Sequence, residues 1–315
     1  MAEEPAPRAL SLLPREEIDY SRMGVSAFVN DQRFGTISEQ FLEVRDSLKL
    51  RYVRVLFGWN DDVQPSPDSS VDYSFYKDIA RNIPQGVQAL VIITGAPSWM
   101  ADPANWSNGD PRLTFHREFL KPTIRKFRRN RKIRAFQVWN EPNIDLPESS
   151  YLDVKDSPEH YIELLRRSYR YIKRRAKGKE VVSAATTSII QNYPETLQYN
   201  EALYSLGAED YLDIWGVHIY GTSVERFLLP GGPTDFLNQL SKPIWVTESG
   251  RQGVNEQLNY VERVWPYLRS IVPGIDRLYF YQFTEGSSDA SNTFGLKNLT
   301  VGSNLSDLYI HLRDR

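Results

Sequence analysis

The sequence has no cysteine among its 315 residues. This absence excludes disulfide bonds, thiolate metal sites and a cysteine nucleophile. Histidine is nearly as scarce, with four residues that are scattered along the chain and lack zinc-ligand spacing: His116, His160, His218 and His311. We therefore expect neither a metal site nor a cofactor.

An excess of one charge and long apolar runs are missing as well. The formal net charge is -2, and acidic and basic residues are interspersed, which argues against a surface that binds nucleic-acid phosphates. The main basic cluster, at 121–134, is typical of the solvated end of a helix. No run approaches the roughly 20 apolar residues of a membrane span. We expect a neutral or weakly charged partner, and neither nucleic acid nor a membrane.

The start of the chain carries no recognisable targeting signal. Residues 1–14 lack the apolar h-region of a secretory signal peptide. This leaves two alternatives: a cytoplasmic protein, or a secreted or periplasmic one whose signal peptide has been removed, and we favour the second. Residues 1–20, with three prolines and several charges, are interpreted as an extended arm. Because we find no repeat or linker, residues 21–315 are expected to form one domain, and a monomer.

Short apolar runs alternate with amphipathic stretches along the whole chain, and 41% of the residues are hydrophobic. The apolar runs are rich in Val, Ile, Tyr and Phe, which is typical of strands buried on both faces. The predicted strands are 24–28, 52–57, 89–94, 135–139, 181–186, 214–218, 244–247 and 277–282. The predicted helices are 38–48, 73–82, 115–129, 157–177, 195–206, 233–240, 255–269 and 303–312.

Eight strand and helix units in alternation predict an α/β protein with a parallel sheet. The clearest helix has Ser157 as its N-cap and Pro158 at its first position, and Gly178 is expected to end it. Because crossovers between parallel strands are right-handed, eight such units favour a closed (β/α)8 TIM barrel. The pattern by itself leaves a doubly wound open sheet as an alternative.

Two of the predicted strands end at a glutamate. Glu141 follows the fourth strand and Glu248 the seventh, and in a (β/α)8 barrel such positions form the working face. Two carboxyl groups that flank one glycosidic bond can hydrolyse it, one as a protonated acid and the other as an ionised group, without a metal. A separation of roughly 5 to 5.5 Å predicts retention of configuration, and roughly 6.5 to 9.5 Å predicts inversion.

Motifs at several strand ends resemble glycoside hydrolase clan A. They are WNEPN at 139–143, TESG at 247–250 and HIY at 218–220. Together with APSW at 96–99, the first of these is most similar to family 39, with family 5 as a near neighbour. The eighth strand ends in YQF at 281–283, where the clan commonly has a tryptophan, so the sugar subsites are not carried over.

The resemblance implies roles for the residues that match these motifs. Glu141 would be the acid/base, Glu248 the nucleophile, and the outcome retaining. Tyr220 would donate a hydrogen bond to Glu248, and Arg54 would keep that carboxylate ionised. Asn140 would bind the sugar 2-hydroxyl and contact the region of the nucleophile.

Other side chains are expected to line the same pocket. His218 would lie in it, on the sixth strand. Sugar rings pack their C–H faces on aromatic rings, so Trp59, Trp99 and Phe283 are candidate stacking platforms. A buried packing role is the alternative for each of these three aromatic residues.

We therefore expect a retaining β-glycoside hydrolase that cleaves an oligosaccharide or polysaccharide. Endo action is favoured, because a barrel of this length has few accessory elements to block its cleft. The alternatives are a transglycosylase with the same residues and a barrel that only binds glycans. An isomerase or aldolase of phosphosugars would need a glycine-rich phosphate loop or a strand-end lysine, for which SGRQG at 249–253 is the only hint.

Overall fold

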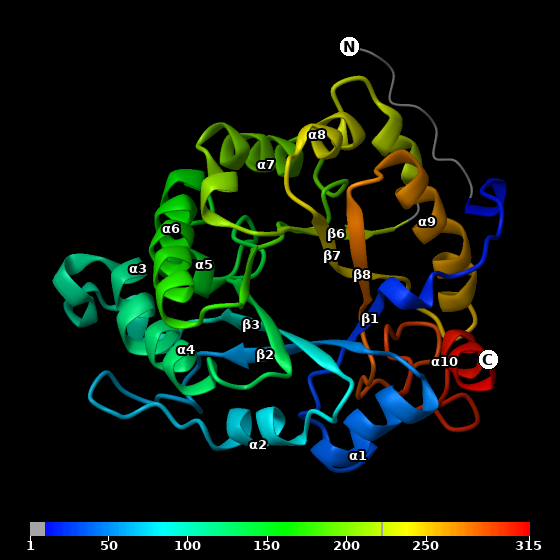
Figure 1. Ribbon diagram of the computed structural model, residues 1–315, viewed down its shortest axis with the longest axis horizontal. Helices are drawn as coiled ribbons and strands as arrows, with labels where there is room; N and C mark the ends of the chain where they lie inside the picture. Colours follow the sequence, from blue (N-terminus) through cyan, green and yellow to red (C-terminus); the bar gives the residue numbers. More distant parts are fainter. Residues whose placement is uncertain (1–9, 222) are drawn as a thin grey trace.

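Eight parallel strands form the centre of the protein (Figure 1). The computed structural model describes residues 10–221 and 223–315. The strands follow the order β5-β4-β3-β2-β1-β8-β7-β6, and each overlaps a predicted strand. Their bounds are β1 Met23–Ser26, β2 Tyr52–Gly58, β3 Gln88–Thr94, β4 Ile133–Val138, β5 Glu180–Ser183, β6 Trp215–Tyr220, β7 Ile244–Gly250 and β8 Ile275–Phe280.

The two outermost strands of this order, β5 and β6, meet and complete the ring. A parallel bridge joins Val182 to Ile214, and the backbone N–H of Ser183 donates to the carbonyl of Ile214 at 3.1 Å. Fewer residues pair between β5 and β6 than between the other neighbouring strands, but the eight strands still enclose one interior. The protein is therefore a single (β/α)8 TIM barrel, and the open sheet is rejected.

Helices surround the strands, and all eight predicted helical stretches contain one (Figure 1). The stretch 115–129 is less regular than predicted, because a π-helical segment, Phe115–Leu120, separates two short α-helices. Helices α3 and α5 were not predicted. The bounds are α1 Ile37–Leu42, α2 Ser74–Asn82, α3 Pro111–Thr114, α4 Lys121–Phe127, α5 Pro147–Tyr151, α6 Pro158–Arg175, α7 Glu195–Ser205, α8 Pro233–Gln239, α9 Gln257–Ile271 and α10 Asp307–Asp314.

Helix α6 fixes the ends of two strands. It begins at Pro158 after Ser157 as predicted, although the Ser157 side chain makes no capping hydrogen bond. The buried Tyr161 hydroxyl donates to the carbonyl of Val138 at 3.0 Å and accepts from the N–H of Ala184 at 2.5 Å. This one side chain therefore links the C-terminal ends of β4 and β5, next to the turn that carries Glu141.

An apolar layer closes the interior of the barrel below the polar groups. Because side chains alternate along a strand, every second residue faces inward, and six of these form one buried cluster: Leu90, Ala135, Val182, Ile214, Trp245 and Tyr279. Gly24 leaves room for the Tyr279 ring, since a Cβ there would lie 2.6 Å from it. Polar side chains above this layer face the C-terminal mouth of the barrel.

The described part of the predicted N-terminal arm packs on α9. Leu10, Leu13 and Ile18 are buried, and the N–H of Glu16 donates to the carbonyl of Glu262 at 2.9 Å. Residues 1–9 of the predicted arm lie outside the described residues. Within 10–221 and 223–315, no helix combines the length and the apolar character needed to cross a bilayer.

Candidate active site

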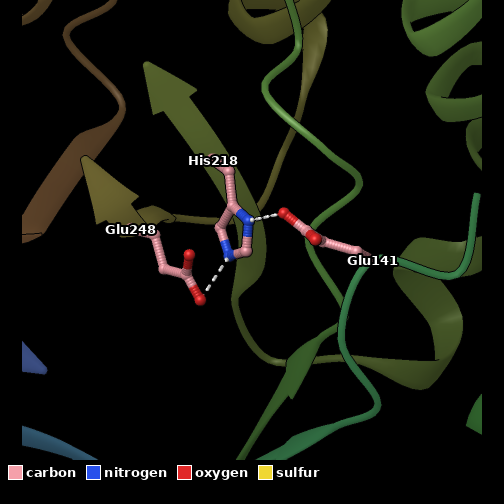
Figure 2. Close-up of side chains that lie close together, drawn as sticks. All are labelled: Glu141, His218 and Glu248. Carbon is pink, nitrogen blue, oxygen red and sulfur yellow. Dashed lines mark hydrogen bonds and ion pairs between the residues drawn. The ribbon is translucent and has the colours of Figure 1, made fainter. Parts of the chain in front are cut away.

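Glu141 and Glu248 face each other across the barrel mouth, with His218 between them (Figure 2). Glu248 lies in β7, and an irregularity in the pairing of β6 and β7 sets His218 beside it. Glu141 lies in the turn after β4. Around the ring β4 and β7 are separated by β5 and β6, so the fold brings together residues that are far apart in the sequence.

The two carboxyl groups are close together. One oxygen of each glutamate and one ring nitrogen of His218 all lie within 4.8 Å of one another. Nδ1 of His218 is 2.9 Å from Oε1 of Glu141, a hydrogen bond, and Nε2 is 3.6 Å from Oε1 of Glu248. A single sugar ring carbon can therefore be reached from both carboxyl groups.

This cluster is also of a kind that can ligate a metal ion, which the histidine spacing along the chain did not suggest. The Arg54 guanidinium already pairs with the same oxygen of Glu248 at 2.6 Å. A divalent cation bound there would lie beside this fixed positive charge and be repelled. The donor set thus fits a carboxylate pair better than a metal centre, and the absence of a metal stays a prediction.

Glu248 is surrounded by donors. It is 8% exposed, and it accepts hydrogen bonds from Nη1 of Arg54 at 2.6 Å and from the Tyr220 hydroxyl at 2.8 Å. Burial alone would raise the pKa of Glu248, but the neighbouring His218 and Arg54 and the bond from Tyr220 together lower it below the ordinary value. The predicted contacts of Arg54 and Tyr220 are present, and they hold Glu248 ionised.

The hydroxyl of Tyr220 stays protonated beside Glu248. Burial and the adjacent Glu248 carboxylate raise the pKa of its hydroxyl well above the usual range. A neutral phenol keeps the proton that it donates to Glu248. The pair therefore consists of one ionised acceptor and one protonated donor.

Arg54 is itself held by three separate acceptors. It is 1% exposed; besides Glu248, it donates through Nε to Oε1 of Gln137 at 2.9 Å and through Nη2 to Oδ1 of Asn140 at 2.8 Å. The amide nitrogen of Gln137 in turn donates to the carbonyl of Ser183 at 3.1 Å. Asn140 thus reaches the nucleophile region through Arg54, and the guanidinium has a single orientation.

Gln137 is a functional candidate that the sequence analysis missed. It is fully buried on β4, two residues before Trp139 and four before Glu141. Gln137 is the one polar residue of the predicted strand 135–139, and this was the available signal, because buried amides need hydrogen-bond partners.

The turn that carries Glu141 is conformationally unusual. Trp139 and Glu141 both adopt left-handed backbone conformations, with φ of 72° and 41°, which cost roughly 1–3 kcal/mol each in a non-glycine residue. Two backbone hydrogen bonds hold the turn: Trp139 N–H to the carbonyl of Ile93 at 2.9 Å, and Glu141 N–H to that of Ala185 at 2.8 Å. The surrounding strands therefore stabilise a strained turn that aims Glu141 at the barrel mouth.

The stacking role expected of Trp59 and Phe283 is wrong. Both side chains are 0% exposed and belong to the core, so neither offers a face to a sugar. Trp59 is five residues after the inward-facing Arg54, so it points outward, and its ring stacks on Phe119 in the helical layer. Trp99 is partly buried against the core and donates to the carbonyl of Gln64 at 2.9 Å; it does not line the cavity beside the glutamates.

Phe28 and Tyr281 line that cavity instead. It measures about 280 Å³ and extends from Glu248 and Glu141 to the predicted loop at 140–156, which contributes Leu146 and Glu148 among others. Burial, with the nearby Glu248 as a further cause, raises the pKa of Tyr281 to about 12. The site therefore has aromatic and aliphatic walls around two carboxyl groups, as a carbohydrate site needs.

Comparisons with known proteins agree with this geometry. The family model described as "Glycosyl hydrolase catalytic core" matches residues 76–308. No curated protein sequence matches the chain. Among solved structures, it is similar to a family 39 glycoside hydrolase from the gut symbiont Bacteroides cellulosilyticus, with 16% identity and a TM-score of 0.63 over 96% of this chain and 65% of that one.

Two further structures represent two kinds of glycoside hydrolase. A monomeric beta-xylosidase from Caulobacter crescentus is 14% identical, with a TM-score of 0.62 over 96% of this chain and 69% of that one. A GH5_18 enzyme from Streptomyces cattleya, in complex with Manβ1-4GlcNAc, is 14% identical, with a TM-score of 0.61 over 93% of this chain and 79% of that one.

The chain thus spans about two thirds of the length of the family 39 enzyme. At these identities the structural likeness shows the fold, whereas the family model covers most of the chain. The fold, the strand-end motifs and the family match agree, so the chain belongs to the glycosyl hydrolase catalytic core family.

Proposed function

We propose that the protein is a retaining β-glycoside hydrolase, with Glu248 as nucleophile and Glu141 as acid/base. The observation that carries the proposal is the approach of the two carboxyl groups to within 4.8 Å. This distance between one oxygen of each group is nearer to the roughly 5 to 5.5 Å of retaining enzymes than to the roughly 6.5 to 9.5 Å that admits the water of an inverting enzyme.

In the first step, an oxygen of Glu248 forms a bond to the anomeric carbon as the bond to the leaving oxygen breaks. The proton of Glu141 passes to that oxygen, so the aglycone leaves as a neutral alcohol. The products are a glycosyl ester of Glu248 and the carboxylate of Glu141.

In the second step, the Glu141 carboxylate takes a proton from water while the water oxygen attacks the anomeric carbon. The ester bond to Glu248 breaks, and its carboxylate is restored. Two displacements at the same carbon give net retention. Glu141 ends protonated, ready for the next cycle.

The surrounding residues support different charge states in the two carboxyl groups. Arg54 and Tyr220 stabilise the anion of Glu248, at 2.6 and 2.8 Å. Glu141 contacts the ring of His218, whose Nδ1 is 2.9 Å away, rather than a guanidinium, so the two carboxyl groups lie in different environments.

The β configuration and the substrate class are part of the proposal. One neighbour is described as a beta-xylosidase, and the family match supports a carbohydrate substrate. We propose endo action on an oligosaccharide or polysaccharide chain. Every side chain of the site comes from one chain, so a monomer suffices for it.

The test is hydrolysis of aryl β-glycosides and soluble polysaccharides by the wild type, Glu141→Ala and Glu248→Ala, with the first-formed anomer followed by proton NMR. We expect a β product and a loss of about 10³-fold or more for Glu248→Ala, since the nucleophile and its covalent intermediate are lost. An α product from a β substrate would rule out the double displacement. Sugar transferred to an added acceptor, in place of water, would indicate a transglycosylase.

A further inference from the structure

A second cavity continues the catalytic one over the rim of the barrel. It measures about 410 Å³ and shares Phe28 and Leu56 with the cavity beside the glutamates. A third cavity of about 600 Å³ shares Asn30 and Phe75 with the second. The shared walls make one groove, the β1–β2 groove, lined among others by Phe28, Asn30, Leu56, Asn60, Asp62 and Phe75.

We infer that the β1–β2 groove binds further sugar units of an uncharged glycan chain whose scissile bond lies between Glu141 and Glu248. This inference rests on the proposed function and adds to it the charge class of the substrate and the side of the barrel over which the chain runs.

The floor of the groove is apolar and open to solvent. Leu56 is 37% exposed and Phe75 is 39% exposed, and both line the second cavity. Leu56 lies two residues after Arg54 on β2 and so points to the same interior side. Phe28 is half-buried and contacts the edge of Tyr281, with ring centroids 5.9 Å apart. Such surfaces match the C–H faces of sugar rings.

The polar rim of the groove offers acceptors for sugar hydroxyls. Asp62 and Asn30 are exposed, and no hydrogen bond to either side chain occurs within the described residues, so both are available to a ligand. By contrast, Asp72 caps the start of α2, accepting from the N–H and the hydroxyl of Ser74 at 2.8 and 2.9 Å. The available groups are one carboxylate and one amide.

The charges of the groove decide which glycans fit. No lysine or arginine lines the second or the third cavity, and the arginine of the catalytic cavity, Arg54, is paired with Glu248. Carboxylates are present in all three cavities, including Glu148 and Asp62. A uronate or sulfated chain would bring further negative charge to this surface without a counter-ion, and would be repelled. An uncharged chain meets no such cost.

The experiment measures kcat/KM for β-linked gluco-, manno-, xylo- and galacto-oligosaccharides of increasing length, from a disaccharide to a hexasaccharide. We expect at least a tenfold rise with length for one neutral series, and no turnover of a β-1,4-linked oligomannuronide, which carries one carboxylate on each sugar. If kcat/KM does not change from the disaccharide to the hexasaccharide in any series that is cleaved, the groove does not bind further sugar units. A higher kcat/KM for the anionic oligosaccharide than for every neutral one would contradict the proposal that the groove binds uncharged glycans.

Two variants separate the groove from general damage. Phe75→Ala removes the exposed ring, and we expect kcat/KM to fall about threefold to tenfold more for the hexasaccharide than for the disaccharide, as for a lost aromatic contact. The matched control is Ile310→Ala on α10, which is 42% exposed and lines none of the three cavities. It should leave every value unchanged. Equal losses at each length for Phe75→Ala would contradict the proposal.

If the wild type cleaves none of these substrates and no aryl glycoside, the proposed hydrolysis fails while the groove is still tested by binding. Calorimetric titration with each neutral hexasaccharide then decides. Binding that weakens in Phe75→Ala and not in Ile310→Ala supports the groove, and lack of binding to all four overturns it.

Discussion

The side-chain oxygen of Gln137 accepts a hydrogen bond of 2.9 Å from Nε of Arg54. The same guanidinium pairs with Glu248, so a neutral amide on β4 orients the group that keeps the candidate nucleophile ionised. A carboxylate in place of this amide would compete with Glu248 for Arg54.

Gln137→Glu should therefore raise the pKa of Glu248. In the wild type that pKa is lowered, so Glu248 stays ionised and active as the pH falls, until the pH passes through its lowered pKa. A second anion near Arg54 weakens this stabilisation, and the acidic limb of the kcat/KM profile should move up by roughly one pH unit, equivalent to about 1.4 kcal/mol. The control is Gln40→Glu, another buried amide, which should not move the limb. If the acidic limb of the Gln137→Glu profile stays at the wild-type pH, Gln137 does not control the ionisation of Glu248 through Arg54.

Tyr220→Phe removes one donor from the Glu248 carboxylate, 2.8 Å away. A hydrogen bond to a charged group contributes about 1.5–3 kcal/mol, so the acidic limb should again shift to higher pH, by roughly one to two units. Tyr281→Phe is the comparison, because this tyrosine lines the cavity beside Glu248 and makes no hydrogen bond to that carboxylate among the described residues. Equal shifts in the two variants would argue against a specific role for Tyr220.

His218→Ala should disturb the position of Glu141, since it removes the 2.9 Å contact from Nδ1. Small misplacement of a reacting group can lower a rate by about 100-fold. We expect the loss mainly in kcat, with KM changed little, as measured by steady-state kinetics on an aryl glycoside. His160→Ala, at a partly exposed histidine outside the barrel mouth, is the control. A change in KM alone would indicate that His218 only contacts the substrate.

Glu141→Ala should depend on the leaving group. A dinitrophenolate leaves without a proton, whereas a sugar alkoxide requires one, so the first step in this variant should be nearly normal with a dinitrophenyl glycoside and slower by about 10²–10⁴-fold with a natural disaccharide. Pre-steady-state release of dinitrophenol measures the first step directly. Similar losses for both substrates would assign a different role to Glu141.

Trp59→Ala tests the correction made for this residue. Because the indole is fully buried and stacks on Phe119, we expect a loss of about 3–5 kcal/mol in the free energy of unfolding, measured by urea denaturation. Trp99→Ala should cost less, since that side chain is partly exposed. A Trp59 variant of normal stability with a raised KM would restore the stacking role.

Much of this protein is determined by its sequence alone. The alternation of apolar runs and amphipathic stretches predicted all eight strands and their helices, because strands buried on both faces and helices with one apolar face leave clear periodic patterns. The strand-end positions of Glu141 and Glu248 predicted where a site would form. The resemblance to glycoside hydrolase clan A also implied that Arg54 and Tyr220 would contact Glu248, and both contacts are present.

Only the tertiary structure decided the rest. The pattern could not show that Phe283, past the end of β8, turns into the core. Trp59, by contrast, is five residues after the inward-facing Arg54, so the alternation of side chains along β2 already placed it toward the helices. The contact of Gln137 with Arg54 joins residues 83 positions apart, and the approach of the two glutamates depends on how β5 and β6 complete the ring. Distances across a barrel are set by the closure and twist of all its strands, which no local stretch of sequence encodes.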